Sequence, residues 1–405
     1  MTKPHIICIA SEFKGNEFME AAQAAGWRVT LLTRDDLRDA DWSWTSINAI
    51  RTIAPESREE EYLREVVNIA ATDRPDHVAG MDEFDVLPSA RIREYLQIYK
   101  GMSRSHALRF RDKLTMRSIA SKAGIPCPEF TGLFNPDAIN EYLERVESPW
   151  IVKPRTEVSA FGIRKCTTPE EVWNVINDLD SRNTWRDHPS KYQLEKFIEG
   201  DVFHVDSAVK DGKIVAQGIN EYGTTPFNVA HGGGVFTSST VEYGSENATR
   251  LAELNEKLLK AFKHTDGVAH AEFLKSAADG EFYLVEVACR VGGAYIANVH
   301  EHARGFNLWR EWGRIETATE EAPYTAPDLK DEYAGIALAL ANTEHPDTSH
   351  YDDEEIVYRV KKPRHVGLIF HAKTKERLEE LLSKYRQRIA EDFLEVAPVK
   401  ERYDD

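Results

Sequence analysis

The chain has 405 residues, which is too long for one small core and predicts two or three domains. Its 51 Lys and Arg residues against 68 Asp and Glu residues give a net charge of −17, which argues against a nucleic-acid or anionic-membrane surface. Four widely spaced cysteines indicate neither a disulfide framework nor a zinc site, and the apolar run at the start is too short for a signal peptide. A reduced, cytoplasmic protein is therefore expected.

The first hundred residues follow the pattern of a parallel α/β unit. A short apolar run at 5–10 is followed by a helical pattern that Gly26 ends, and then by a second strand over 27–33. Another strand ends at residues 77–80. Strand, helix and strand at this spacing predict an N-terminal parallel α/β domain. No Gly-x-Gly-x-x-Gly follows the first strand, so a dinucleotide-binding fold is not supported.

The middle of the chain changes pattern. A helical stretch runs from Lys113 to Ala123 and is closed by Gly124. Beyond it, strands are expected over 149–152 and 192–198, with a helix over 169–179 between them.

The last part of the chain is rich in strands. Residues 202–241 carry many glycines and threonines and lead into a helix over 247–264. Apolar runs at 334–340 and 365–370 predict further strands, and a helix over 374–389 has its leucines on one face.

A hairpin with two glutamates is the most informative feature. Apolar runs at 268–274 and 282–289 flank Ala278-Asp279-Gly280, which reads as a hairpin loop. A centre near Asp279 places Glu272 opposite Glu286. Like charges directly opposite on a sheet are destabilising, so a divalent cation such as Mg²⁺ is expected between them.

The ordinary alternative is that both glutamates lie on a solvated face, since charged residues are mostly exposed. Glu286 lies deep in an apolar run, and period-two alternation puts Ala288 and Arg290 on its face. The Gly292-Gly293 pair that follows also favours a functional site.

A lysine and a loop of small residues follow the strand at 149–152. Lys153 ends that strand, and the loop after it finishes with Ser159-Ala160-Phe161-Gly162. Backbone amides of such a loop can bind phosphate, with Lys153 adding a point charge. A lysine at a strand end is more often simply solvated.

The segment 193–200 alternates and ends abruptly at a glycine. It is either an ordinary half-buried strand or an adenine site. In the second interpretation the backbone near Lys196 and Ile198 bonds the base edge. Glu195 then accepts from the amino group, and Phe197 or Ile198 covers the ring.

His231 precedes three consecutive glycines, 232–234. Such a run costs backbone entropy, so it indicates a moving loop or a close approach to a ligand. The histidine is a candidate donor to a developing oxyanion, or an ordinary exposed loop residue.

Together these motifs resemble the ATP-grasp superfamily in order and spacing, over roughly residues 1–320. The motifs are Lys113, Lys153-Pro154, Glu195 to Gly200, Glu272 and Glu286-x-x-x-Arg290. The resemblance implies a mixed α/β and α+β architecture. It has an N-terminal parallel α/β domain (1–110), a small central lid lobe (111–198) and a larger C-terminal lobe with an antiparallel sheet (199–405).

The resemblance also implies a site for ATP and Mg²⁺, with Mn²⁺ as a substitute. Lys113 and Lys153 would contact the phosphates, Glu195 the adenine amino group, and Glu272 and Glu286 the metal. The rest of the predicted ATP site is made of Ser159, Gly162, Lys196, Phe197 and Ile198.

Two positions depart from the superfamily pattern. Val202 stands where many members carry a ribose-binding Glu, and His204 is then a candidate for that contact, as are Asp201 and Asp206. Ala288 stands where many members carry an Asn beside the metal.

Within the superfamily, the segment 286–293 and the upstream His-Gly-Gly-Gly are similar to bacterial L-amino-acid ligases of the bacilysin-synthetase type. That resemblance assigns His231 and Arg290 to stabilising the acyl phosphate and the tetrahedral intermediate. It implies an ATP-dependent carboxylate–amine ligase that forms an amide (peptide) bond between amino acids and releases ADP and phosphate. The expected partners are small-molecule substrates and, by default, a second copy in a homodimer.

Two other functions stay open. One is an ATP-grasp carboxylase or purine-pathway-type ligase, which would activate bicarbonate or formate. The other is a nucleotide-binding regulator without turnover, which the departures at Val202 and Ala288 would suit.

Overall fold

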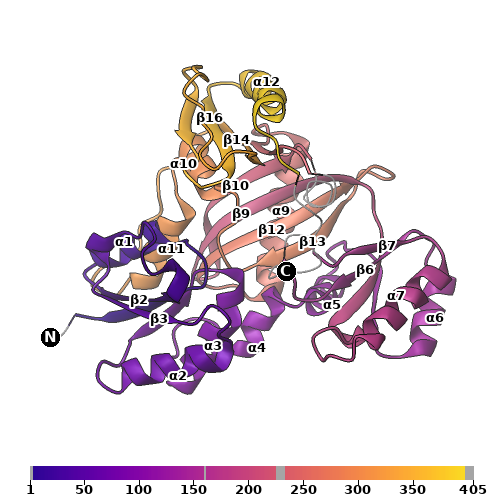
Figure 1. The fold of residues 1–405 in the computed structure, drawn as a ribbon, viewed down its shortest axis with the longest axis horizontal. Coiled ribbons are helices and arrows are strands. Elements are labelled where there is room, and N and C mark those ends of the chain that lie inside the picture. Colours follow the sequence, from indigo (N-terminus) through magenta and orange to yellow (C-terminus); the bar gives the residue numbers. More distant parts are fainter. Residues whose placement is uncertain (1–2, 159–160, 225–232, 397–405) are drawn as a thin grey trace.

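The chain forms three lobes, each built on its own sheet (Figure 1). The structure is a computed structural model, and it describes residues 3–158, 161–224 and 233–396. His231 and Ser159, two of the predicted site residues, lie outside the described residues.

The N-terminal lobe is a four-stranded parallel sheet. Its spatial order is β3 (Ala49–Ile53), β2 (Arg28–Arg34), β1 (His5–Ala10) and β4 (His77–Gly80). The helices of this lobe are α1 (Asn16–Ala24), α2 (Glu59–Ala70), α3 (Val86–Tyr95) and α4 (Arg104–Ala107). Both β1 and β4 are buried along their whole length, as is usual for parallel strands covered on two faces.

The central lobe is a four-stranded antiparallel sheet. Its spatial order is β5 (Phe130–Gly132), β8 (Tyr192–Lys196), β6 (Trp150–Pro154) and β7 (Arg164–Cys166). Two helices, α6 (Pro136–Arg145) and α7 (Pro169–Ser181), pack into the same apolar cluster as the sheet. Each begins with a proline after a capping residue, Asn135 or Thr168, whose side chain accepts from the first turn.

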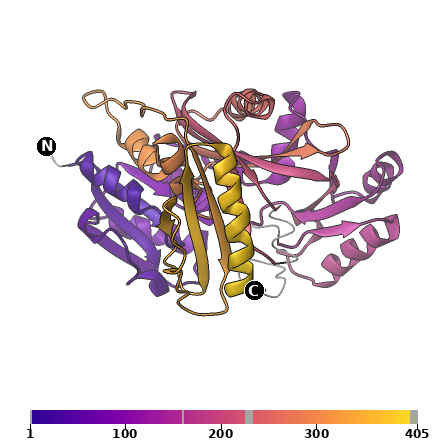
Figure 2. The ribbon, with the colours of Figure 1, turned by 90° about the horizontal axis from the view of Figure 1, so that it is seen from above.

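The C-terminal lobe carries an eight-stranded antiparallel sheet. Its spatial order is β13 (Phe282–Ala288), β12 (Gly267–Ser276), β9 (Gly200–Lys210), β10 (Lys213–Tyr222), β11 (Phe236–Thr240), β14 (Tyr333–Leu340), β16 (His365–Ala372) and β15 (Ile356–Arg359). The helices of this lobe are α9 (Glu246–Phe262), α10 (Ile296–Arg304), α11 (Leu308–Thr317) and α12 (Lys375–Asp392). Seen from above, α12 lies along β14 and β16 (Figure 2).

The two faces of the large sheet differ in chemistry. One face packs on α9 and on α5 (Lys113–Lys122) through an apolar cluster that includes Phe203, Val205, Ala271, Phe273 and Val287. Because side chains alternate along a strand, the residues between these point to the opposite face. The polar part of that second face is made of His204 and Asp206 of β9, His270 and Glu272 of β12, and Glu286 of β13.

The N-terminal and C-terminal lobes share a core. Helix α11 packs on α1, and the Trp312 ring lies edge-on to Phe18 with 5.1 Å between the ring centroids. The cluster joins β1 and β2 to Ala208 of β9 and Val268 of β12. The N-terminal lobe is thus fixed against the end of the large sheet.

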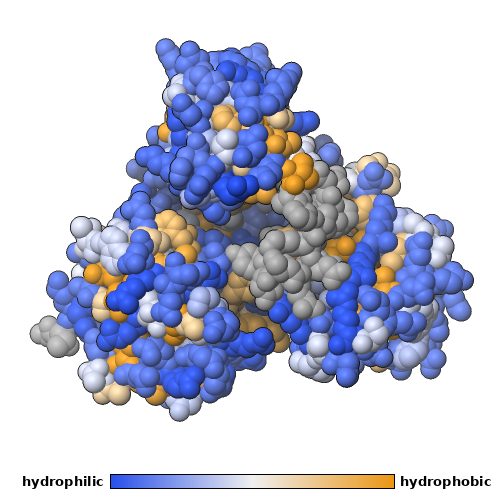
Figure 3. Space-filling model, viewed as in Figure 1, coloured by the Kyte–Doolittle hydropathy of each residue, from blue (hydrophilic) through white to orange (hydrophobic). Residues whose placement is uncertain are grey.

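The molecule is hollowed where the three lobes meet (Figure 3). An N-terminal parallel sheet with helices and two antiparallel lobes confirm the predicted fold class. The domain boundaries drawn from the sequence stay a prediction. No helix within the described ranges is long and apolar enough to cross a membrane.

Candidate active site

Glu272 of β12 and Glu286 of β13 face each other as direct partners in the ladder. Their side chains are 13% and 25% exposed, so neither lies on a freely solvated face. A bulge lies between the Phe273–Leu284 and Glu272–Glu286 pairs, so that Val285 is the extra residue on β13. The predicted pairing of the two carboxylates is therefore confirmed.

Lys113 brings a positive charge to Glu286. It is the first residue of α5, which begins there because the Asp112 side chain accepts from the Thr115 N–H. Its Nζ lies 3.0 Å from Glu286 Oε2 and donates to the Glu157 carbonyl at 2.8 Å. Burial alone would raise the pKa of Glu286, but the charges of Lys113 and Arg290 lower it to about 2.

Lys153 and Glu195 form a buried group with Arg117 that we call the Glu195 triad. Lys153 Nζ lies 2.7 Å from Glu195 Oε2, and Arg117 Nε lies 2.8 Å from Glu195 Oε1. Arg117 also donates to the Val285 carbonyl at the bulge, at 2.7 Å. Burial lowers the pKa of Lys153 to about 8, although Glu195 opposes the shift. The triad holds two cations for one carboxylate.

Two backbone N–H groups at the end of β8 are already hydrogen-bonded within the protein. The N–H of Lys196 donates to the Glu129 carbonyl, and that of Phe197 donates to the Pro149 carbonyl, each at 2.9 Å. The Phe197 ring lies under the ammonium of Lys165, with 3.9 Å from Nζ to the ring centroid. Ile198 is half-buried.

Arg290 joins the C-terminal lobe to the N-terminal lobe through a second group, which we call the Glu83 triad. Its Nε donates to Glu83 Oε2 at 2.6 Å, and Arg111 Nη1 donates to Glu83 Oε1 at 2.5 Å. Glu83 follows β4 in the N-terminal lobe. Burial would lower the pKa of Arg290, but Glu83 and Glu286 raise it above its ordinary value. This triad also has two cations for one carboxylate.

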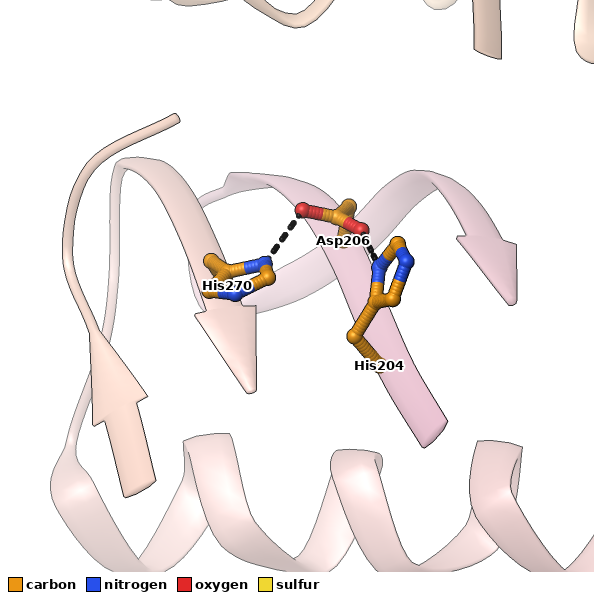
Figure 4. Close-up of side chains that lie close together, drawn as sticks. All are labelled: His204, Asp206 and His270. Carbon is orange, nitrogen blue, oxygen red and sulfur yellow. Dashed lines mark hydrogen bonds and ion pairs between the residues drawn. The ribbon is translucent and has the colours of Figure 1, made fainter. Parts of the chain in front are cut away.

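A buried histidine–aspartate network lies on the same polar face. His204 Nδ1 is 2.6 Å and His300 Nε2 is 3.0 Å from Asp206 Oδ2, and His270 Nδ1 is 2.8 Å from Asp206 Oδ1. Figure 4 shows the His204 and His270 rings turned toward the two Asp206 oxygens. His204 Nε2 also contacts Ser238 Oγ at 2.8 Å. Both nitrogens of His204 therefore have protein partners, and its assignment to the ribose stays a prediction.

The charges in this network are divided between the histidines. Burial alone would lower the pKa of His270, but Asp206 and the hydrogen bond to Glu272 raise it to about 10. Burial lowers the pKa of His204. His270 and His204 in turn hold the pKa of Asp206 well below its usual value, against the effect of burial. His270 is thus the protonated member between two carboxylates.

The structure brings most of the predicted site residues together. One group of them lies on the β12–β13 hairpin, away from its loop, and consists of Glu272, Glu286, Lys113 and Arg290. Arg117 links the Glu195 triad to the same hairpin. Gly162 lies at a positive φ of 68° just before β7, beside residues that are not described. Two facing carboxylates with lysines at hand have the chemistry to hold a magnesium–nucleotide complex.

Several residues of this site were missed by the sequence reasoning. They are Glu83, Arg111, Arg117, Tyr222, His270 and His300. A signal existed for one of them, His270, because His204-x-Asp206 and His270-x-Glu272 share the spacing that puts both side chains on one face of a strand. Nothing local indicates that β9 and β12 are neighbours.

Residues 146–298 match the family model of the ATP-grasp domain. An L-amino acid ligase from Bacillus licheniformis has the same fold, with a TM-score of 0.75 and 16% identity over 98% of this chain and 100% of that one. An ADP complex of N5-carboxyaminoimidazole synthetase from Staphylococcus aureus has a TM-score of 0.73 and 14% identity, over 95% and 98% of the two chains. The chain therefore contains an ATP-grasp domain and has the ATP-grasp fold, which confirms the predicted resemblance.

Sequence relatives lie among the amino-acid ligases. An L-arginine-specific L-amino acid ligase of Bacillus subtilis is 27% identical over 259 residues, which are 63% of this chain and 59% of that protein. Alanine–anticapsin ligase of Bacillus subtilis (strain 168) is 28% identical over 149 residues, which are 35% and 31% of the two chains. The matches thus span about three-fifths and about one-third of these relatives.

Proposed function

We propose that the protein is an ATP-dependent carboxylate–amine ligase that forms an amide (peptide) bond between amino acids. The observation that carries this proposal is the pair Glu272 and Glu286, which face each other with Lys113 at one of them. The names of the relatives, which are amino-acid ligases, support amino acids as the substrate class.

The chemistry has two steps. A substrate carboxylate oxygen attacks the γ-phosphorus of ATP, the bond from phosphorus to the bridging oxygen breaks, and ADP leaves. The amine nitrogen of the second substrate then attacks the carbonyl carbon of the acyl phosphate. The carbon–oxygen bond to phosphate breaks, inorganic phosphate leaves, and the amine loses a proton to the surroundings. The protein must position the reactants and neutralise negative charge.

The residues divide this work by charge. Glu272 and Glu286 would hold Mg²⁺ or Mn²⁺, which when bound neutralises phosphate charge. Lys113 neutralises Glu286 in this structure and would be free to contact a phosphate group once a divalent ion takes that role. Lys153 and Arg290 each belong to a triad with one cation in excess, so both can accept an anionic ligand.

The predictions for residues outside the described ranges complete the proposal. His231 would stabilise the acyl phosphate and tetrahedral intermediate with Arg290, and Ser159 would contact phosphate. Cytoplasmic location and a homodimer also stay predictions.

Formation of ADP and phosphate in the presence of Mg²⁺ tests the proposal. We expect release only with particular amino acids, together with a dipeptide mass in the products. Bicarbonate or formate as the sole stimulant would instead identify a carboxylase or purine-pathway-type ligase, a class that shares this fold. Tight ATP binding without any release would identify a regulator.

Glu286→Gln provides the matched control for that assay, because it removes the charge and conserves the volume. Loss of a metal ligand should lower turnover at least about 100-fold, since the metal supplies several kcal/mol of charge stabilisation. An unchanged circular dichroism spectrum would show that the fold persists. Wild-type turnover in this variant would refute the metal assignment.

A further inference from the structure

The histidine–aspartate network ends on a predicted metal ligand. His270 Nε2 lies 3.3 Å from Glu272 Oε1, and the Tyr222 hydroxyl donates to the same oxygen at 2.9 Å. Through its other nitrogen, His270 is bonded to Asp206, as described above. A continuous chain of contacts therefore runs from the core of the sheet to the carboxylate of Glu272.

The strand register explains why this chain of contacts is possible. In the β9–β12 ladder His270 pairs with Asp206, and Glu272 pairs with His204. Residues two apart on one strand share a face, so four polar side chains lie on a single patch of the sheet. His300 of α10 then covers this patch from above, with its ring against Gly218 of β10.

The surrounding backbone is shaped to fit the network. A Cβ at Gly218 would lie 2.0 Å from His300 Nδ1. A Cβ at Gly292 would lie 2.9 Å from both Asp206 Oδ1 and His270 Nδ1. Both glycines are thus required by close approach of the network. At Gly293, by contrast, a Cβ would meet nothing within 4 Å.

A metal ion within the network is the main competing interpretation. Ligand atoms of His204, Asp206 and His270 lie within 4.8 Å of one another, a spacing that could hold an ion. The contacts themselves, 2.6 and 2.8 Å between nitrogen and oxygen, are hydrogen-bond lengths. Tetrahedral ligands about 2.1 Å from one ion would be about 3.4 Å apart. The geometry therefore favours hydrogen bonds over coordination.

Burying the charged groups of this network costs desolvation free energy, and a purely structural role does not account for that cost. Asp206, His204 and His300 have no exposed surface. A buried ionic group is often no more stabilising than well-packed apolar residues of similar volume, so its retention calls for another role. The contact with Glu272 supplies one.

We propose that Asp206, His270 and Tyr222 are positioning residues that fix the Glu272 carboxylate for the divalent cation. Asp206 orients the His270 ring, and His270 and Tyr222 together hold Oε1. This inference rests on the proposed function, because it takes Glu272 to be a metal ligand. Removal of such outer partners typically weakens metal affinity about 10- to 100-fold.

Substitution of His270 separates its two contacts. In Asn the amide nitrogen occupies roughly the place of Nδ1, so His270→Asn can keep the bond to Asp206 but loses the one to Glu272. In Gln the amide nitrogen lies near the place of Nε2, so His270→Gln can keep the bond to Glu272. We expect H270N to weaken Mn²⁺ binding in the presence of ADP about 10- to 100-fold, and H270Q to recover most of that loss.

The measurement is electron paramagnetic resonance titration of Mn²⁺ with ADP present, with ADP binding in the absence of metal as a second readout. ADP binding without metal should not change in H270N. His264→Gln is the matched control, since His264 is also buried but its Nε2 bonds the Val268 carbonyl instead of a carboxylate. Should H270N fail to fold, Tyr222→Phe removes the other donor to Oε1 and is expected to weaken Mn²⁺ by about 10-fold.

The outcomes separate the two proposals. If the full-length protein shows no metal-dependent ADP binding, or Glu272→Gln binds Mn²⁺ normally, the metal assignment itself fails. If E272Q loses Mn²⁺ but H270N and Y222F bind it as the wild type does, only the positioning role is overturned. Equal losses in H270N, H270Q and H264Q would also overturn it, as would a tightly bound transition metal found by elemental analysis of the purified protein.

Discussion

At the scale of single residues, every predicted phosphate-binding cation already has a carboxylate partner. Lys113 pairs with Glu286, Lys153 with Glu195, and Arg290 with Glu83. Buried charges must be paired, and each of these contacts supplies one such pair. In each triad a second cation, Arg117 or Arg111, leaves one positive charge in excess, within a chain whose net charge is −17. The site is therefore locally suited to an anionic ligand.

Lys153 makes the affinity for ATP dependent on pH. Burial lowers its pKa from 10.5 to about 8, so the lysine loses its proton as the pH rises through about 8. We expect kcat/KM for ATP to fall over that range, because this ratio reports the free enzyme. The fall should be absent in Lys153→Arg, since arginine stays protonated. The same fall in that variant would assign the effect to another group.

Titration of Lys153 would not destabilise the fold over the same range of pH. Folding lowers the pKa of Lys153, so burial of the charged lysine opposes folding below pH 8. This opposition disappears as the pH rises from about 8 towards 10.5, because the folded state releases its proton first. The contribution of Lys153 to the free energy of unfolding therefore increases over the range in which activity should decrease.

At the scale of elements, the β12–β13 hairpin shows how far the sequence could lead. A loop centred on Asp279 predicts the Glu272–Glu286 pair, yet Lys275 pairs with Phe282, which puts the centre half a residue earlier. The bulge at Val285 compensates and restores the pair. It also presents a carbonyl to Arg117, a contact that no local pattern indicates. The sequence predicts the Glu272–Glu286 pair, but it does not predict the bulge that restores this pair.

Contacts between elements far apart in sequence could not be predicted. Single strands and helices follow from apolar periodicity, as the helix expected over 169–179 shows, which is α7 in the structure. The meeting of His270 with Asp206 depends on β12 lying beside β9, and His300 arrives from α10. The order of the strands depends on packing between distant segments, and local sequence patterns do not show which segments pack together.

The packing of α10 on the large sheet depends on Gly218, because the His300 ring lies against it. We expect Gly218→Ala to lower the free energy of unfolding by about 1–3 kcal/mol, because its Cβ would overlap the His300 ring. Gly293→Ala is the control, since space is open there and φ is not positive. Urea denaturation of both variants checks this expectation. Equal stability of the two would contradict the close packing of His300.

At the scale of the whole molecule, the core shared by the N-terminal and C-terminal lobes holds Glu83 next to Arg290. Trp312 of α11 packs on Phe18 of α1 and is almost fully buried. Trp312→Ala should lower the free energy of unfolding by about 3–5 kcal/mol and loosen the N-terminal lobe. Trp185, which is 71% exposed, gives the control substitution to alanine. A loss no larger in W312A than in W185A would show that this core does not fix the lobes.

The central lobe is joined to the C-terminal lobe through the same groups that would bind the nucleotide. Arg117 bonds both Glu195 and the Val285 carbonyl, and Lys113 bonds Glu286. A ligand between the lobes would therefore touch the contacts that set their spacing. This agrees with lobes that close around the substrate to exclude water from an acyl phosphate.

The most direct measurement is calorimetric titration of the full-length protein with a non-hydrolysable ATP analogue, with and without Mg²⁺. We expect Mg²⁺ to strengthen binding to the wild type and to have no such effect on the double variant E272Q/E286Q. If the double variant gained affinity from Mg²⁺ as the wild type does, the two facing glutamates would not be the metal site, and the proposed ligase mechanism would lose its basis.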